Sequence, residues 1–404
     1  MKEIRRSARL ANVSYAVRGP LVAAADELIA QGVDVLKLNI GNPAAFGYST
    51  SHSVIEAMSR RLDGAQAYSH SRGLPEAREA ALAYCRSKGI KDITVNDVYI
   101  GNGASELIAV CLNALMADGD EILIPSPDYP LWTASANFTG GKAVHYRCDE
   151  SSDWMPDLAD IESKITDRTR AITIINPNNP TGALYSEDML LRIADIARRH
   201  GLIVFCDEIY DRLLMPGEKH TSLASLVDDL LVITFNGLSK SHQICGFRSG
   251  WMCISGDRSG AADYIAGINV LLSMRLCPNV PAQFALIEAL KDPFECKPQF
   301  MPGGRTYEQI VTTAETINSI PGMSVKQARG AFYMFPRIDA KRFNITDDNK
   351  FCMDFLKEKH VLVVAGTGFN WPDPDHFRVV CLPEVSVLKE AMERLGDFLQ
   401  TYRQ

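Results

Sequence analysis

The chain has 404 residues, of which 46% are hydrophobic and 23% charged, a mixture typical of a globular protein with two or three domains. Its net charge of −7 and its scattered basic residues argue against nucleic acid as a partner. No apolar run reaches the roughly 20 residues needed to span a membrane, and the N-terminal segment lacks the apolar core of a secretory signal. The ten cysteines are widely spaced without a Cys-x-x-Cys pair, which favours free thiols, no metal site and a cytoplasmic location.

The first predicted element is a helix at 20–31, which has Pro20 at its first position and Gly32 after its end. A strand is expected at 34–40. Between about 75 and 290, short apolar runs alternate with helical stretches, which is typical of a mostly parallel sheet covered by helices on both faces. These apolar runs are residues 98–101, 120–124, 143–147, 170–175, 202–206, 230–235 and 250–254.

The pattern changes after about residue 300, where a long helix is expected at 306–319 and a final helix at 384–402. Shorter strand-like pieces lie between these helices, near 331–336, 360–364 and 376–381. We therefore expect an N-terminal segment (1–48) that joins a small α+β domain (301–404), and a large α/β domain (49–300) between them. A site between the domains would lie at the C-terminal ends of the large domain's strands.

A candidate nucleophile, Lys240, follows the apolar run at 230–235 in a small, hydroxyl-rich turn. A lysine forms an imine with an aldehyde only when it is partly deprotonated, which burial and neighbouring cations encourage. Arg248, eight residues later, has the planar fork that binds a phosphate. A surface lysine beside a structural arginine would give the same pattern.

A carboxylate and a phenol, Asp207 and Tyr210, follow the apolar run at 202–206. A buried aspartate at the end of a strand would keep a pyridinium nitrogen protonated, so that the ring accepts electrons. A helix-capping or salt-bridged acid is the alternative interpretation.

Two irregular turns follow other predicted strands. Asn179 lies in the turn 176–182, which contains two Asn-Pro pairs, and its amide would bond a ring hydroxyl or a carboxylate. Gly103, Ala104 and Ser105 open a helix near 104, where backbone N–H groups and the helix dipole favour an anion. A plain turn and an ordinary glycine-rich loop are the alternatives.

Together these four segments resemble the fold-type I aminotransferases, in the branch that contains aspartate, aromatic and alanine aminotransferases. The resemblance extends over nearly the whole chain, and it rests on Asn-Pro-Asn-Asn-Pro-Thr-Gly, Asp-Glu-Ile-Tyr, and Ser-Lys with arginine eight residues after the lysine. It implies an α/β fold with a mostly parallel large domain and a smaller α+β domain built from both chain ends. It also implies pyridoxal 5'-phosphate (PLP) as the cofactor and a homodimer with shared active sites.

Position by position, the resemblance implies that Lys240 is the Schiff-base lysine and that it later moves a proton at the substrate's α-carbon. Asp207 matches the partner of the pyridine nitrogen, and Tyr210 and Asn179 match the groups that bond the ring's 3-hydroxyl oxygen. The phosphate would be bound by residues from three segments. An aromatic side chain would stack on the ring, although a tyrosine of the core is a serious alternative interpretation of that residue. These matches are Gly103, Ala104, Ser105, Ser239 and Arg248 for the phosphate and Tyr129 for the ring.

Substrate contacts follow from the same resemblance. Arg378 matches the arginine that binds the substrate α-carboxylate, and Gly41 would add a backbone contact to it. Tyr15 and Arg18 would close over the substrate, with Arg18 meeting the side-chain carboxylate of glutamate, although a packing role is equally consistent with their position. Tyr68 matches a phosphate contact that the family takes from the partner subunit.

One position departs from the family pattern. Many relatives carry a serine three residues before the lysine, where this chain has Gly237. Either Ser239 supplies the missing hydroxyl, or the phosphate has one donor fewer.

Segments outside the catalytic motifs are similar to those of bacterial aminotransferases that exchange amino groups between glutamate and pyruvate. We therefore expect L-alanine and 2-oxoglutarate as substrates in a ping-pong reaction. A broader specificity for aspartate, aromatic or branched amino acids, and a PLP-dependent carbon–sulfur lyase, remain alternatives. A regulator that uses this fold as a ligand sensor usually carries a DNA-binding module, for which this chain has no room.

Overall fold

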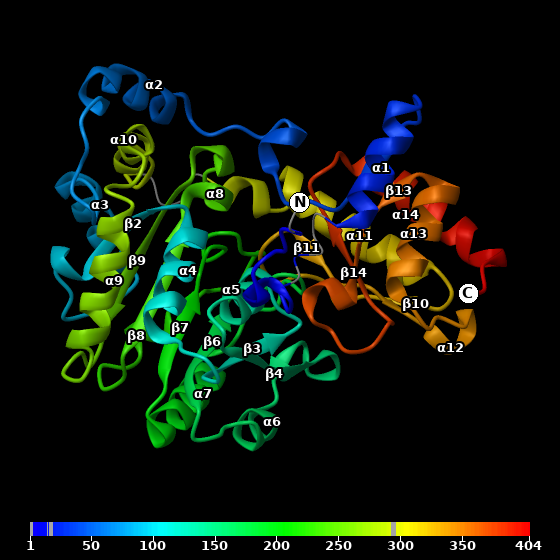
Figure 1. Cartoon of the computed structure of the whole chain (residues 1–404). Helices are drawn as coiled ribbons and strands as arrows, with labels where there is room; N and C mark the ends of the chain where they lie inside the picture. The colour runs from blue at the N-terminus through cyan, green and yellow to red at the C-terminus, as the bar shows by residue number, and fades with distance from the viewer. Residues whose placement is uncertain (1–2, 14, 16–18, 292–295) are drawn as a thin grey trace.

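The computed structural model describes residues 3–13, 15, 19–291 and 296–404, which form a large and a small domain side by side (Figure 1). The large domain contains an eight-stranded sheet in the order β2-β9-β8-β7-β6-β3-β4-β5. Its strands are β2 (Val98–Asn102), β3 (Glu121–Ser126), β4 (Lys142–Asp149), β5 (Met155–Pro156), β6 (Thr169–Ile175), β7 (Ile203–Asp207), β8 (Val232–Gly237) and β9 (Ser249–Ser255).

The five central strands β8, β7, β6, β3 and β4 run parallel, as the alternation of apolar runs and helices predicts. β9 lies antiparallel between β2 and β8, and β5 is antiparallel to β4. The prediction of a mostly parallel sheet is confirmed. β3, β6, β7 and β8 are buried on both faces, which explains why they read as continuous apolar runs rather than as alternating patterns, whereas β4 is only partly buried.

Helices cover both faces of this sheet. Those on one face share a core with Ile122 and Phe205, and those on the other share a core with Leu123 and Val204. The first set is α4 (Ala104–Leu115), α5 (Leu131–Phe138) and α9 (Ala262–Met274). The second includes α3 (Pro75–Ser87), α7 (Glu187–His200) and α10 (Val280–Ala289), and the remaining helices of this domain are α2 (His52–Arg60), α6 (Leu158–Ser163) and α8 (Leu238–Ser241).

The ends of α7 show how local sequence sets these elements. The Ser186 side chain accepts a hydrogen bond from the Met189 backbone N–H, which caps the first turn. Acidic residues occupy the first turn and basic residues the last, and both arrangements stabilise the helix dipole. Gly201 then ends the helix in the left-handed conformation.

The small domain combines residues from both ends of the chain, as expected. Its helices are α1 (Pro20–Ala30), α11 (Arg305–Ser319), α12 (Ala340–Phe343), α13 (Asp348–Lys359) and α14 (Val385–Thr401). Its strands are β1 (Leu36–Lys37), β10 (Met323–Ser324), β11 (Tyr333–Met334), β12 (Arg337–Ile338), β13 (Val361–Leu362), β14 (Val364–Ala365) and β15 (Phe377–Val380). β1 pairs in parallel with β13, so the N-terminal segment is part of this domain. The strand expected at 34–40 is only two residues long.

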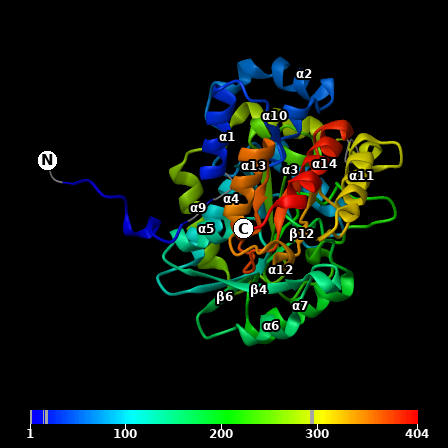
Figure 2. The ribbon, with the colours of Figure 1, turned by 90° about the vertical axis from the view of Figure 1, so that its right-hand side faces the viewer.

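The N-terminal arm (residues 3–13) projects from the body of the molecule, with its free end farthest out, and runs inward to the large domain (Figure 2). The Asn137 side chain of α5 donates a hydrogen bond to the Asn12 backbone oxygen at 3.0 Å, which anchors the arm. Within the described ranges, no helix is long and apolar enough to cross a membrane. The domain boundaries at 48/49 and 300/301 stay a prediction.

Candidate active site

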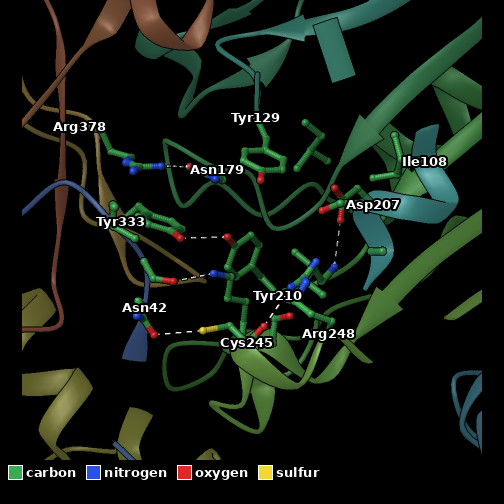
Figure 3. Close-up of a pocket in the computed structure, with 18 of the residues that line it drawn as sticks. Asn42, Ile108, Tyr129, Asn179, Asp207, Tyr210, Cys245, Arg248, Tyr333 and Arg378 are labelled. Atoms are coloured by element: carbon green, nitrogen blue, oxygen red, sulfur yellow. Dashed lines mark hydrogen bonds between the residues drawn. The ribbon is translucent and has the colours of Figure 1, made fainter. Parts of the chain in front are cut away.

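A cavity of about 510 Å³ lies at the C-terminal ends of β6, β7 and β8, where the small domain covers the large one. Residues from both domains line it, and Figure 3 shows most of them. They are Tyr15, Ile40, Gly41, Asn42, Ala104, Ser105, Ile108, Tyr129, Ile175, Asn179, Asp207, Ile209, Tyr210, Ser239, Lys240, Cys245, Gly246, Arg248, Tyr333 and Arg378.

Lys240 lies in α8, the short helix that directly follows β8. Its side chain is half-buried, and its Nζ donates a hydrogen bond to the Gly41 backbone oxygen at 2.6 Å. A Cβ atom on Gly41 would lie 1.9 Å from the Tyr333 hydroxyl, so the close approach of this loop requires glycine. The contact places an amine of the large domain against a loop of the small domain inside the cavity.

Asp207 is the last residue of β7 and is 4% exposed. The Trp132 indole N–H donates to its Oδ2 at 3.2 Å, and the Ile209 backbone N–H donates to its Oδ1 at 3.3 Å. Burial raises the pKa of Asp207 to about 6, and these two donors only partly offset that effect. A carboxylate in this position favours a cationic partner in the cavity.

Arg378 lies in β15 and is buried against Tyr333 and Phe369, with its guanidinium carbon about 4.5 Å from each ring centroid (4.6 and 4.5 Å). Its Nη1 donates to the Asn179 side-chain oxygen at 3.0 Å, and its Nη2 donates to the Asn39 backbone oxygen (Figure 3 shows the first). Among the described residues, no acceptor pairs with its buried Nε. Burial lowers the pKa of Arg378. A carboxylate would supply both the missing acceptor and the missing charge.

Tyr210 follows β7, and its hydroxyl donates to the Tyr333 hydroxyl at 3.1 Å (Figure 3). Burial raises the pKa of Tyr210, and the Tyr333 hydroxyl raises it further, so the phenol is neutral at physiological pH. Tyr333 lies on β11 and was missed by the sequence analysis. It sits in an apolar run without a motif, so no signal in the sequence distinguishes it from a core residue.

An anion-binding corner lies where α4 begins. Ala104 and Ser105 form the first turn of α4 beside Gly103, whose φ of +81° suits glycine. A Cβ on Gly103 would lie 2.2 Å from Nη2 of Arg248, so glycine allows the guanidinium to approach the helix N-terminus. Ser239, at the start of α8, faces the same cavity. Helix N–H groups, a hydroxyl and a guanidinium together form a typical phosphate-binding set.

Gly237, which departs from the expected family pattern, has little room for a side chain. A Cβ at this position would lie 2.8 Å from the Ser249 backbone oxygen and 3.2 Å from the Gly250 Cα. β9 therefore lies too close for a larger residue without a local shift.

At the mouth of the cavity, the Tyr15 hydroxyl lies 2.8 Å from the Tyr129 hydroxyl, and the rings meet edge to face. Arg18 lies outside the described residues. Tyr68 is 79% exposed and is not part of the cavity wall. The structure therefore brings together the other predicted site residues, and whether they act as expected stays a prediction.

A family profile described as aminotransferase class I and II matches residues 33–395. The chain belongs to this family. The glutamate-pyruvate aminotransferase AlaA of Escherichia coli is 53% identical over 404 residues and covers all of both chains. The alanine aminotransferase of Mycobacterium tuberculosis is 49% identical over 400 residues, which is 99% of this chain and 93% of that protein. The predicted resemblance is confirmed.

Solved structures of aminotransferases agree with this assignment. An aminotransferase from Escherichia coli has a TM-score of 0.98 at 53% identity, with 100% of both chains covered. The alanine aminotransferase from Pyrococcus furiosus has a TM-score of 0.93 at 40% identity, covering 98% of this chain and 100% of that one.

Members of this aminotransferase family use PLP. The cavity fits that group on two independent observations. The corner formed by Gly103 and Arg248 suits a phosphate, and Asp207 offers a buried carboxylate to a cationic ring nitrogen. The Nε of Arg378, which lacks an acceptor in the part of the chain that the structure describes, would receive one from a substrate carboxylate.

Proposed function

We propose that this aminotransferase binds PLP and exchanges the amino group between L-alanine and 2-oxoglutarate, giving pyruvate and L-glutamate. The observation that carries amino transfer is that Lys240, Asp207 and Arg378 face one cavity. Alanine as a substrate is supported by the names of relatives that are 49% to 53% identical over nearly the full length of this chain.

When bound, PLP supplies an electron-accepting ring that stabilises negative charge at the substrate's α-carbon. The first turn of α4, Ser239 and Arg248 would bind the phosphate. The carboxylate of Asp207 would keep the ring nitrogen protonated. Asn179 and Tyr210 would bond the 3-hydroxyl oxygen, and Tyr129 would pack against the ring.

Lys240 would hold the cofactor covalently through its amine between turnovers and would act as the base that moves the proton at the α-carbon. Its amine lies at the Gly41 backbone oxygen, in the same cavity as Arg378, which would bind the α-carboxylate of the substrate. Arg378 orients the substrate through its fork, and the Gly41 backbone adds a further contact. Tyr15 and Arg18 would cover the substrate, and Arg18, which lies outside the described residues, would meet the second carboxylate of glutamate.

The active unit that we propose is a homodimer. The surface around α9 exposes large apolar side chains, which are Val270, Met274 and Leu276, and the segment that carries Tyr68 reaches it. Arg72 of that segment donates to Asn269 of α9 at 2.9 Å. A partner on this surface would bury these side chains, and Tyr68 would reach its phosphate. The ten free thiols suit the reducing cytoplasm.

Turnover with and without an acceptor tests this proposal. Without 2-oxoglutarate the enzyme should form at most one equivalent of pyruvate per site from L-alanine, and continued turnover should need 2-oxoglutarate. Valine and aspartate should be poorer donors. Equal rates with aspartate or valine would indicate a broad specificity. Release of pyruvate and ammonia from a cysteine derivative without any keto acid would indicate a carbon–sulfur lyase and overturn the proposal.

A further inference from the structure

A buried cluster of charges lies behind the turn that carries Asp207 and Tyr210. Lys88, the residue directly after α3, places its Nζ 2.6 Å from Oδ2 of Asp211 and also contacts Oε2 of Glu208. The three side chains are only 13%, 2% and 3% exposed, respectively. All three lie outside the cavity wall.

Asp211 joins two turns that carry different parts of the site. It follows Tyr210 directly in the chain, and its Oδ2 accepts a hydrogen bond from the side-chain amide of Asn236 at 2.7 Å. The side-chain oxygen of Asn236 in turn accepts from the Gly237 backbone N–H at 2.7 Å. One buried carboxylate therefore connects the turn after β7 to the end of β8, from which α8 and Lys240 continue.

Glu208 makes two further hydrogen bonds, one to a residue outside this pair of turns and one to β8. The Ser222 hydroxyl donates to its Oε1 at 2.7 Å, and its own backbone N–H donates to the Phe235 backbone oxygen at 2.9 Å. His220 has a ligand atom within 4.8 Å of Glu208 and Asp211, a spacing that a metal ion could use. Lys88 already contacts both carboxylates, so an ammonium group provides the cation there.

A second cation balances the cluster. The Arg212 guanidinium lies over the Tyr84 ring at 4.2 Å, and its Nε donates to the Tyr84 hydroxyl, which itself donates to Asp211. Burial alone would raise the pKa of Asp211, but the charge of Lys88 and the other nearby cations lowers it to about 2. Burial alone would lower the pKa of Lys88, but Asp211 and Glu208 raise it well above its usual value. Lys88 and Asp211 are therefore both charged at neutral pH.

Loss of the Lys88 charge would leave two buried carboxylates undercompensated. Glu208 adjoins Asp207 in the chain, and its charge already adds to the effect of burial in raising the pKa of Asp207. The carboxylates of Glu208 and Asp211, which lie between the turn after β7 and the end of β8, would then lack the ammonium group that compensates their charge.

We propose that Lys88 is a positioning residue for amino transfer: by neutralising Glu208 and Asp211, it holds the turn of Asp207 and Tyr210 against the end of β8 that leads to Lys240. This inference rests on the proposed function. Lys88 acts through these neighbours and touches neither substrate nor cofactor.

The test compares Lys88→Met, which keeps the length of the stem but removes the charge, with Lys88→Arg, which keeps the charge. Lys142→Met is the matched control, because Lys142 is 69% exposed and its ion pair with Glu121 lies at the sheet surface. For each variant we would measure unfolding by urea, PLP affinity, the pH dependence of the cofactor's visible absorbance, and kcat and KM for alanine.

We expect Lys88→Met to lower kcat by about tenfold, because misplacement of the reacting groups slows the chemical step, with KM changing less than kcat. The midpoint of the absorbance titration should move to higher pH by roughly half a unit, because lost positive charge favours protonation nearby. Lys88→Arg should restore most of both properties, and Lys142→Met should match the wild type. A folded Lys88→Met with wild-type kcat and midpoint would overturn the inference.

Asn236→Ala covers the case in which Lys88→Met does not fold, because it cuts the link between the two turns without removing a charge. It should lower kcat while leaving the absorbance midpoint unchanged, and an unchanged kcat would overturn the inference. The absorbance comparison needs no substrate. If the wild type binds PLP but transfers no amino group from alanine, the proposed function fails. The absorbance midpoints of the wild type, Lys88→Met and Lys88→Arg can still be compared in that case.

Discussion

Asp207 is a buried carboxylate. Among the described residues, the N–H groups of Trp132 and Ile209 donate hydrogen bonds to it and partly offset the cost of burying its charge. Its folded-state pKa of about 6 is above the ordinary value of 3.8, so the folded protein binds this proton more tightly than the unfolded chain. The preference of the folded state for the protonated carboxyl therefore adds to the free energy of unfolding below pH 4. This contribution is lost as the pH rises through about 6. The cofactor-free protein keeps a destabilising charge where the ring nitrogen is expected.

Asp207→Asn removes that charge and should stabilise the cofactor-free protein at pH 7.5. The gain in the free energy of unfolding should be larger at pH 7.5 than at pH 5 by about 1 kcal/mol, because near pH 5 most of the wild-type carboxyl is already protonated. Urea unfolding at the two pH values measures this difference. The same variant should bind PLP more weakly. A gain that does not change with pH would show that Asp207 does not titrate in this range.

Arg378→Lys tests whether the fork of this arginine binds the substrate carboxylate. Lysine keeps the charge but cannot reproduce bidentate geometry, so KM for alanine and for glutamate should both rise, on the order of tenfold. Arg329→Lys is a matched control, because Arg329 makes a bidentate pair with Glu218 at 2.8 and 2.6 Å outside the cavity wall. Unchanged KM values for both substrates would remove Arg378 from the proposed site.

At the scale of elements, the junction between β2 and α4 depends on a single glycine. Gly103→Ala should displace Arg248, because the new Cβ would lie 2.2 Å from its Nη2, and PLP affinity should fall about tenfold or more. Gly201→Ala is the control, since Gly201 also has a positive φ (+63°), but a Cβ there would meet no atom of the described residues within 4 Å. Both variants should lose about 1 kcal/mol of stability through backbone strain. Equal PLP affinity in the two variants would contradict the phosphate role of this corner.

The strand ends that carry Asn179, Asp207 and Lys240 were predictable, because each apolar run is followed directly by polar side chains. The direction of β9 was not, since a strand buried on both faces has the same apolar composition whether it runs parallel or antiparallel. Short pairings such as β1 with β13 involve two residues each and have too little periodicity to be read from a sequence.

The site residues that could not be predicted are those that reach the site only through tertiary contacts. Trp132 and Tyr333 reach Asp207 and Tyr210 from distant segments, and their own neighbours in sequence resemble those of any core aromatic residue. The cluster around Lys88 is similar, because Lys88 lies more than 100 residues before its acidic partners. Only the folded arrangement shows which charges compensate each other.

At the scale of the whole molecule, Tyr68 decides whether the active unit is shared. Lys240→Ala and Tyr68→Ala, unfolded together and refolded as a mixture, should form mixed dimers with one doubly damaged site and one intact site. Activity should therefore rise above the average of the two parents. If mixed dimers form and activity stays at that average, Tyr68 acts in its own subunit or outside the site.

The pairing of Leu36 with Val361 also constrains when the enzyme becomes complete during its synthesis. A ribosome adding 5 to 20 residues per second needs about 15 to 60 seconds between these two positions. The large domain has its whole sheet available long before then, whereas Arg378 and the partner strand of β1 emerge only near the end. For that interval α1 and β1 lack α13 and β13, the elements that they contact in the folded protein, so their apolar side chains are open to aggregation in the nascent chain.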